Sequence, residues 1–257
     1  MKSFPKQIVL LTLLIAVPSF ASIHIVTDID DTIRVTSVHD PVAAVWNTVI
    51  RMRPFAGMPE LLQSLLAQDS DRKIDYVTGA PGVLRFEVER FLSKNEFPEG
   101  GVHFAPLILA QDSLANYKLA QIRKIMAGDP DSKFIFLGDD QQFDPTVYFT
   151  LFLENPSQVK EIYIHKIRDV RLPSAVYPFI TAFDIARMEY EFLRMDLSSV
   201  LKVGQAIVDE KSDKKILPYF QTCPSALTLQ TDNHEVIEMQ EKVDDRVKEI
   251  CEKRDLL

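Results

Sequence analysis

The chain has 257 residues, of which 46% are hydrophobic and 26% charged, so it is long enough for one sizeable domain with an extension. These values exclude a fibrous chain and a largely disordered one. Residues 1–21 contain two of the 29 basic residues, Lys2 and Lys6, and no acidic residue. The remaining 27 basic and 37 acidic residues give a net charge of about −10 beyond residue 21. A chain this acidic is a poor general partner for nucleic acid, and we expect none, although it can still carry a local basic site for an anionic substrate.

Residues 1–21 have the layout of a secretory signal peptide. Lys2 and Lys6 precede a ten-residue apolar run from Ile8 to Val17, and small residues in Ser19-Phe20-Ala21 suit a cleavage site. The run is too short to span a bilayer comfortably, although a short membrane anchor or a buried first strand are alternatives. We therefore expect an exported protein, either periplasmic or secreted.

Strand-like and helix-like segments alternate up to about residue 170. Strands are expected at 23–26, 74–77, 104–109, 133–137 and 161–165, the last of the sheet, with helices at 58–66, 86–92, 114–126 and 145–152. This alternation predicts an α/β fold, a doubly wound parallel sheet of the Rossmann-like kind, over a catalytic domain at residues 22–175. Ligands of such folds bind at the carboxyl ends of the strands.

The pattern changes beyond residue 175, where a long amphipathic stretch covers 179–208 and a loop-like segment covers 209–232. Asp232 is a suitable N-cap for a last helix, with Glu235 three residues later. Apolar residues then recur at helical spacing: Val236, Met239, Val243, Val247 and Ile250. We expect residues 176–257 to form a helical extension packed on the core; a coiled-coil or dimerisation helix is the alternative, and the oligomeric state stays open.

Cys223 and Cys251 are the two cysteines of the chain, and neither belongs to a metal-binding cluster. Outside the cytoplasm they can form a disulfide, and otherwise they are free thiols in a packed region. The sequence leaves both possibilities open.

The strongest chemical signal is the segment Asp28-Ile29-Asp30-Asp31-Thr32, which follows the first apolar strand. Two carboxylates two residues apart suit phosphoryl chemistry, because one can attack phosphorus while the other protonates the leaving oxygen. The hard cation Mg²⁺ prefers oxygen ligands such as a carboxylate of Asp28 and a backbone carbonyl near Asp30. A calcium loop of the EF-hand kind is excluded, because its glycine and glutamate positions hold Ile33 and His39.

Four further residues gain weight from their order along the chain. Thr78 follows the second strand and can donate its hydroxyl to a phosphoryl oxygen, and Lys118 lies early in a helix and can neutralise phosphoryl charge. Asp139 lies in the turn that follows the strand expected at 133–137, and it can complete a metal site. Asp144 precedes a helix that it can also cap. Taken singly, Thr78 is compatible with a helix cap and Lys118 with a solvated surface.

In this order the sequence resembles the haloacid-dehalogenase superfamily and, within it, the catalytic domain of the yeast actin-patch phosphatidate phosphatase and its bacterial relatives. The resemblance covers about residues 23–171. The segments that carry it are Asp28-Ile29-Asp30-Asp31-Thr32-Ile33, Asn47-Thr48, Pro54-Phe55-Ala56-Gly57-Met58, Tyr76-Val77-Thr78, Phe97-Pro98, Tyr117-Lys118-Leu119, Gly138-Asp139, Asp144-Pro145 and Ile167-Arg168-Asp169-Val170.

The resemblance implies a phosphatase that forms an aspartyl-phosphate and requires Mg²⁺. Asp28 would be the nucleophile and a metal ligand, and Asp30 the general acid/base that also gives its carbonyl to the metal. Thr78 and Lys118 would hold the phosphoryl group. Asp139 would bind the metal, and Asp144 would support the metal site.

The substrate expected from the resemblance is phosphatidate, cleaved to diacylglycerol and phosphate, with peripheral membrane contact. The chain departs from the family pattern at Thr78-Gly79-Ala80-Pro81-Gly82 and at Asp140-Gln141, where substrate-facing residues are expected. A soluble phosphomonoester, or a non-catalytic role in binding phosphate or lipid head groups, are the alternatives.

An open site also favours a bulky or membrane-embedded substrate. Residues 33–57 have room for a small flap that includes Trp46, with little or no cap. Four arginines are expected near the strand ends or the flap, where they could contact an anionic head group or serve as ordinary surface charge: Arg34, Arg51, Arg53 and Arg85.

Overall fold

The computed structural model describes residues 22–36, 52–107, 111–168, 170–224 and 231–255. Its elements in chain order are β1 (Ile23–Thr27), β2 (Arg34–Val35), β3 (Arg53–Pro54), α2 (Met58–Ala67), β4 (Lys73–Pro81), the 3-10 helix η1 (Gly82–Leu84), α3 (Arg85–Lys94), β5 (Gly101–Ala105), α4 (Gln111–Gly128), β6 (Lys133–Asp139), α5 (Asp144–Glu154), β7 (Val159–His165), β8 (Tyr177–Phe179), α6 (Ala182–Glu191), α7 (Leu197–Asp209), α8 (Asp213–Ile216) and α9 (His234–Asp255).

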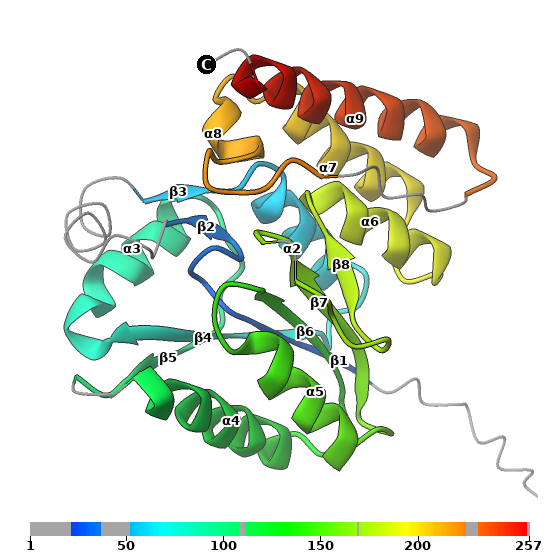
Figure 1. Ribbon diagram of the computed structural model, residues 1–257. Coiled ribbons are helices and arrows are strands. Elements are labelled where there is room, and N and C mark those ends of the chain that lie inside the picture. Colours follow the sequence, from blue (N-terminus) through cyan, green and yellow to red (C-terminus); the bar gives the residue numbers. More distant parts are fainter. Residues whose placement is uncertain (1–21, 37–51, 108–110, 169, 225–230, 256–257) are drawn as a thin grey trace, which may run out of the picture.

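A six-stranded parallel sheet in the order β5-β4-β1-β6-β7-β8 forms the centre of the molecule (Figure 1). The predicted α/β class with a doubly wound parallel sheet is therefore confirmed. β2 and β3 pair antiparallel as a separate two-stranded ribbon beside the end of β1. This ribbon flanks residues 37–51, so the predicted flap with Trp46 and Arg51 lies largely outside the described residues.

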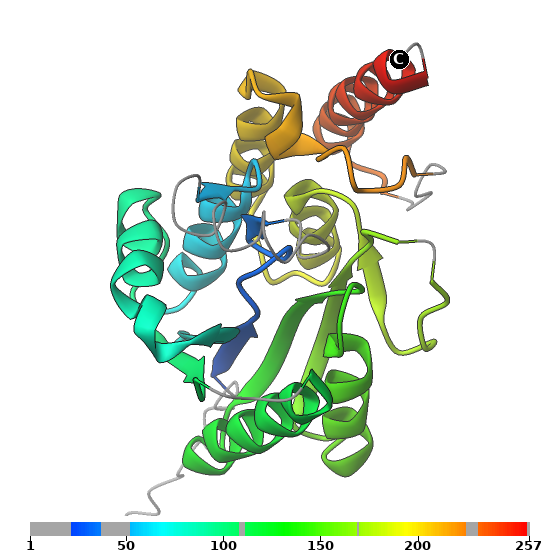
Figure 2. The same ribbon diagram turned by 60° about the vertical axis from the view of Figure 1, so that its left-hand side comes forward.

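Helices cover both faces of the sheet, as its strand sequences require. Successive residues of β6 alternate between two separate apolar cores, with Ile135 and Leu137 in one and Phe134 and Phe136 in the other. The first core is closed by α2, α3, α6, α7 and α9, and the second by α4 and α5. Figure 2 shows α2 and α3 in cyan to teal on one side of the sheet and α4 and α5 in green on the other.

A topological switch point, where the connecting helices change from one face of the sheet to the other, lies between β1 and β6. The helix that follows β1, α2, packs in the first core, and the helix that follows β6, α5, packs in the second. The chain therefore leaves these neighbouring strands in opposite directions, and folds of this kind bind ligands at the carboxyl ends of such strands. Asp28 lies directly after β1 and Asp139 is the last residue of β6, so both lie at this switch point.

Several strand predictions were wrong in detail. The strand expected at 74–77 does not stop at Thr78, because β4 continues to Pro81. The third predicted strand, 104–109, is shifted: β5 ends at Ala105, where Pro106 lacks the N–H that a ladder needs. The strand at 161–165 is not the last, because β8 adds three residues at the edge next to β7. The segment Tyr177-Pro178-Phe179 is short and contains a proline, which is tolerated at a sheet edge but gives a weak strand signal.

The amphipathic stretch expected at 179–208 forms two helices, α6 and α7. α6 and α7 are separated by a turn in which Leu193 adopts a φ of 58°, and Asp196 accepts the backbone N–H of Ser199 at 3.0 Å to begin α7. The predicted cap of the last helix was one residue early. Asn233, not Asp232, accepts the N–H groups of Glu235 and Val236, at 3.0 and 3.2 Å.

The C-terminal helices pack on the sheet domain. The five apolar residues predicted to line one face of α9 are all buried in the first core: Val236, Met239, Val243, Val247 and Ile250. The predicted packing on the core is thus observed. Gly57, with a φ of 81° before α2, lets the chain approach closely: a Cβ there would lie 3.1 Å from Ile207 and 3.2 Å from Ala182.

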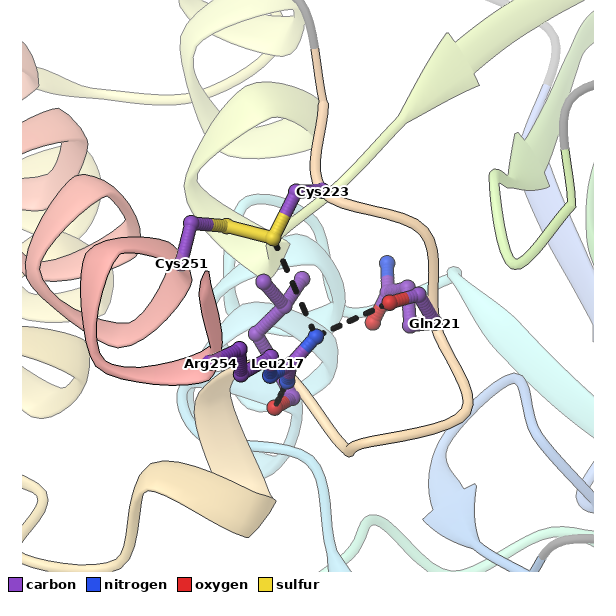
Figure 3. Close-up of a disulfide and its surroundings, with 5 residues drawn as sticks. All are labelled: Leu217, Gln221, Cys223, Cys251 and Arg254. Carbon is purple, nitrogen blue, oxygen red and sulfur yellow. Dashed lines mark hydrogen bonds between the residues drawn. A yellow bond between two sulfur atoms is a disulfide. The ribbon is translucent and has the colours of Figure 1, made fainter. Parts of the chain in front are cut away.

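A disulfide between Cys223 and Cys251 joins α9 to the loop after α8 (Figure 3). Arg254 strengthens the same junction, because its guanidinium donates to the carbonyls of Gln221, at 2.9 Å, and Leu217. Of the two possibilities that the sequence left open, the structure has the disulfide.

Residues 1–21, the predicted signal peptide, lie outside the described residues. Among the residues that the structure describes, no helix is long and apolar enough to cross a membrane.

Removing the disulfide is expected to destabilise the fold. The Cys223→Ser/Cys251→Ser double variant loses a cross-link that closes 28 residues of chain. We expect the free energy of unfolding, measured by urea denaturation, to fall by about 3 kcal/mol. Loss of less than about 0.5 kcal/mol would mean that the apolar contacts of α9 alone hold it in place.

Candidate active site

A tight turn after β1 positions the acidic segment. The N–H groups of Ile33 and Arg34 donate to the carbonyl of Ile29, at 3.1 and 2.9 Å, and Asp31 adopts a φ of 56°. Ile29 and Ile33 are fully buried in the first core, which anchors the turn from below. The polar residues between these two anchors are thereby held at the carboxyl end of β1.

Asp28 is almost completely buried at this turn, with 2% of its surface exposed. One carboxylate oxygen, Oδ1, accepts a hydrogen bond from Lys118 Nζ at 2.7 Å, and the other lies 3.4 Å from the Thr32 hydroxyl. Its backbone N–H donates to the carbonyl of Leu137 in β6. The side chain is therefore fixed by the strand on one side and by α4 on the other.

Asp139 and Asp144 complete a buried group of three carboxylates with Asp28. One oxygen from each residue lies within 4.8 Å of the others, so the group could hold a metal ion. Gly138 permits this arrangement, because a Cβ at that position would lie 2.6 Å from Asp144 and from Tyr148. The N-cap position of α5 is occupied by Phe143, and Asp144 is the first residue of the helix. The carboxylate of Asp144 accepts a hydrogen bond from Lys118, so Asp144 does not cap the helix.

Lys118 is the buried counterion of the cluster. Its ammonium donates to Asp28 at 2.7 Å and to Asp144 at 2.5 Å. Burial opposes its charged form, but the carboxylates of Asp144, Asp28 and Asp139 outweigh this effect and raise the pKa of Lys118. Lys118 therefore stays protonated. It was predicted to hold the phosphoryl group, and in the structure it contacts Asp28, the predicted nucleophile.

Three carboxylates share this one ammonium, and their pKa values show the excess of negative charge. Burial raises the pKa of Asp28 to about 8; Lys118 opposes the shift, and Asp144 and Asp30 add to it. Burial also raises the pKa of Asp139 well above its ordinary range, with further contributions from Asp144 and Asp28. A second cation beside the cluster would favour the ionised form of these carboxylates.

The donor set fits a hard divalent cation. All three side chains offer carboxylate oxygens, the ligands that Mg²⁺ prefers, and no described histidine or cysteine belongs to the cluster. The excess negative charge around Lys118 is a second feature that a bound cation would offset. The side chain of Asp30, predicted to contribute only its carbonyl, is not one of the three clustered carboxylates.

Asp30 is instead held between two polar side chains. Its Oδ1 forms an ion pair with Arg34, and its Oδ2 accepts a hydrogen bond from the Thr78 hydroxyl at 3.2 Å. Thr78 is itself fixed by the N–H of Ala80, at 3.0 Å. Asp30 and Thr78 thus meet as the sequence order led us to expect, with Asp30 just after β1 and Thr78 three residues before the end of β4.

The predicted arginines differ in their places. Arg34 is 1% exposed and lies beside Asp30, with its guanidinium 6.0 Å from the Phe91 ring. Arg85 is half exposed, pairs with Glu89 and lies over Phe104, so it does not reach the cluster. Arg53 is exposed on β3.

Two residues near the cluster were given no role from the sequence, although Gln141 was noted as a departure from the family pattern. Gln141, between Asp139 and Asp144, donates its side-chain N–H to Asp31 at 2.9 Å. His165, the last residue of β7, donates from Nδ1 to the Asp31 carbonyl at 2.7 Å and stacks on Phe179. The position of His165 at a strand carboxyl end was the available signal for it, and the position of Gln141 between two acidic site residues was the signal for that residue.

Sequence comparisons relate most of the sheet domain to a known enzyme family. Residues 23–166 match the family described as the catalytic domain of the phosphatidate phosphatase APP1. The phosphatidate phosphatase APP1 of Saccharomyces cerevisiae is 29% identical over 153 residues, which are 55% of this chain and 25% of the yeast protein. The matched segment thus spans about a quarter of that relative.

A solved structure, that of the Pnkp1/Rnl/Hen1 RNA repair complex, contains a chain that is 16% identical, with a TM-score of 0.35. The match covers 62% of this chain and 42% of that one. A likeness this low supports no conclusion about fold or function.

Removing the buried ammonium is expected to destabilise the metal-free protein. Lys118→Met leaves the carboxylates of Asp28 and Asp144 without a partner, and we expect a loss of about 3–5 kcal/mol in urea unfolding with EDTA present. Lys124→Met, at an exposed position of the same helix, is the matched control. Adding Asp144→Asn to Lys118→Met should recover part of the loss, and equal stability of both single variants would contradict the assigned charge balance.

His165 is expected to make the free energy of unfolding depend on pH under mildly acidic conditions. Burial lowers the pKa of His165 from 6.5 to about 4, so the folded protein holds the neutral ring. Its contribution to stability is present above pH 6.5 and is lost as the pH falls towards 4, by about 3 kcal/mol in all. His165→Asn can still donate to Asp31, and its free energy of unfolding should fall less steeply between these pH values; identical slopes would refute the coupling.

Proposed function

Because the chain belongs to the family of the phosphatidate phosphatase APP1 catalytic domain, we propose that it is a Mg²⁺-dependent phosphatase of the haloacid-dehalogenase type. Its proposed reaction is the hydrolysis of phosphatidate to diacylglycerol and phosphate. The observation that carries this proposal is the contact of buried Asp28 with Lys118, within a cluster of three carboxylates at the switch point of the sheet. Asp30, held by Thr78, stands beside it as a second carboxylate.

In the proposed mechanism, a carboxylate oxygen of Asp28 attacks the phosphorus of the monoester. The bond from phosphorus to the leaving oxygen breaks, and Asp30 gives that oxygen a proton, which leaves an aspartyl-phosphate and the free alcohol. Asp30 then takes a proton from a water molecule that attacks phosphorus, which releases phosphate and restores Asp28. Lys118 and Thr78 would hold the phosphoryl oxygens during both steps.

The carboxylates of Asp28, Asp139 and Asp144 and the backbone carbonyl of Asp30 would hold Mg²⁺. When bound, Mg²⁺ would offset the negative charge of the carboxylates and of the phosphoryl group. The all-oxygen donor set and the excess charge around Lys118 support this assignment. Zinc is disfavoured, because its usual nitrogen and sulfur ligands do not occur in the cluster.

A lipid substrate follows from the family, and it would require contact with a membrane surface. The segment that separates β2 from β3, residues 36–52, is too short for a separate cap domain, so a bulky ester need not enter an enclosed chamber. Export by the N-terminal segment, to the periplasm or further, is part of the same proposal. The Cys223–Cys251 disulfide is in keeping with it, because disulfides persist in oxidising compartments.

The test is phosphate release from phosphatidate in mixed micelles and from soluble phosphomonoesters, with Mg²⁺ or with EDTA. We expect Asp28→Asn to lower kcat by at least about a thousandfold, because it removes the nucleophile. Asp30→Asn should lower it by about 10²–10⁴. Asp131→Asn is the matched control, because this exposed residue precedes β6 at the other end of the sheet.

The outcomes separate the parts of the proposal. Mg²⁺-dependent release that favours phosphatidate supports it in full. Release from soluble esters alone would keep the mechanism and reject the lipid. Full activity of Asp28→Asn would reject the aspartyl-phosphate, and the absence of any phosphate release would favour a binding role.

A further inference from the structure

Gln141 occupies the loop that joins two residues of the carboxylate cluster, Asp139 and Asp144. Only 8% of its surface is exposed, although glutamine is usually a surface residue. A buried amide has two donors and an acceptor to satisfy, so its surroundings decide what it does.

Three groups of Gln141 have partners that hold the residue in one orientation. The backbone N–H donates to Asp139 Oδ1 at 2.6 Å, and the side-chain Nε2 donates to Asp31 Oδ2 at 2.9 Å. The backbone carbonyl accepts a hydrogen bond from the guanidinium of Arg168. Gln141 thus links the turn after β1 to the end of β6, the two segments that carry Asp28 and Asp139.

The side-chain oxygen of Gln141, Oε1, is the remaining group. It is buried, and the structure gives it no hydrogen-bond partner. The amide cannot turn over to exchange its ends, because an ionised Asp31 carboxylate only accepts hydrogen bonds and would then face the oxygen. An acceptor left unpaired inside a protein costs free energy, so it points to a group that binds there.

We infer that Gln141 Oε1 is a further oxygen donor of the cation site, acting on the cation itself or on a water molecule in its shell. The inference rests on the proposed function, which places a divalent cation among Asp28, Asp139 and Asp144. Amide oxygens bind hard cations, and outer-shell acceptors orient the ligands around them. Gln141 is hydrogen-bonded to Asp139, one of these ligands, and to Asp31.

The test is direct cation binding without substrate, measured by titration calorimetry with Mg²⁺ and with Mn²⁺ on the purified protein. Gln141→Met keeps the length of the side chain but removes both its donor and its acceptor. Gln141→Glu keeps an oxygen and removes the donor to Asp31. Gln142→Met is the matched control, because this half-buried neighbour has no hydrogen bond from its side chain in the described part of the chain.

We expect Gln141→Met to weaken cation binding by at least about tenfold, the range seen when outer-shell partners are removed. Gln141→Glu should bind within about threefold of the wild type or more tightly, because its carboxylate also binds cations. Gln142→Met should bind like the wild type. Should Gln141→Met not fold in EDTA, judged by circular dichroism, Gln141→Ala takes its place in the comparison.

Two results would overturn the inference alone. Unchanged binding by Gln141→Met would show that Oε1 is not used. Equal weakening in Gln141→Met and Gln141→Glu would show that Gln141 only holds Asp31, since both variants lose that hydrogen bond. If the wild-type protein bound neither cation, the proposed Mg²⁺ site would fall together with the role of Gln141.

Discussion

One buried ammonium group, that of Lys118, contacts the carboxylates of Asp28 and Asp144 at 2.7 and 2.5 Å. Without a counterion, each of these charges would cost several kcal/mol to keep in the interior. Lys118 compensates only part of the negative charge, and the remainder could be compensated by a second positive charge or by protons. The stability of the carboxyl edge of the sheet and its capacity for chemistry therefore have the same origin.

The fold brings these charges together without any local sequence contact between them. Asp28 and Lys118 are 90 residues apart, and Lys118 and Asp144 are 26 apart. They meet because β1 and β6 are neighbours whose helices leave on opposite faces, while α4 begins at the same edge as these strands end. Gly138 removes the one Cβ that would keep α5 from approaching.

Much of this arrangement could be predicted from the sequence, because it depends on chain order. Apolar runs ending in Asp28, Thr78 and Asp139 predict strands whose carboxyl ends share one edge, and the structure has this pattern. The capacity for a disulfide was visible too, but whether it forms depends on a distance between α9 and a distant loop that no local pattern encodes.

The features that escaped prediction depend on tertiary contacts. β8 is short and contains Pro178, so only its pairing with β7 makes it a strand. His165 and Gln141 have ordinary local surroundings in the sequence, and only the fold brings both to Asp31. The cap of α9 was misplaced by one residue because Asp232 and Asn233 are both good caps, and the packing of the helix decides between them.

The matched family segment ends at residue 166, whereas the first apolar core continues into α6, α7 and α9. A polypeptide that stopped at the family boundary would lose the apolar side chains that α6, α7 and α9 contribute to this core, and it would lack β8 and the Ile180 carbonyl beside His165. All proposed reacting groups would still be present in such a fragment. In this chain, the apolar core is therefore built from a longer segment than the one that carries the proposed reacting groups.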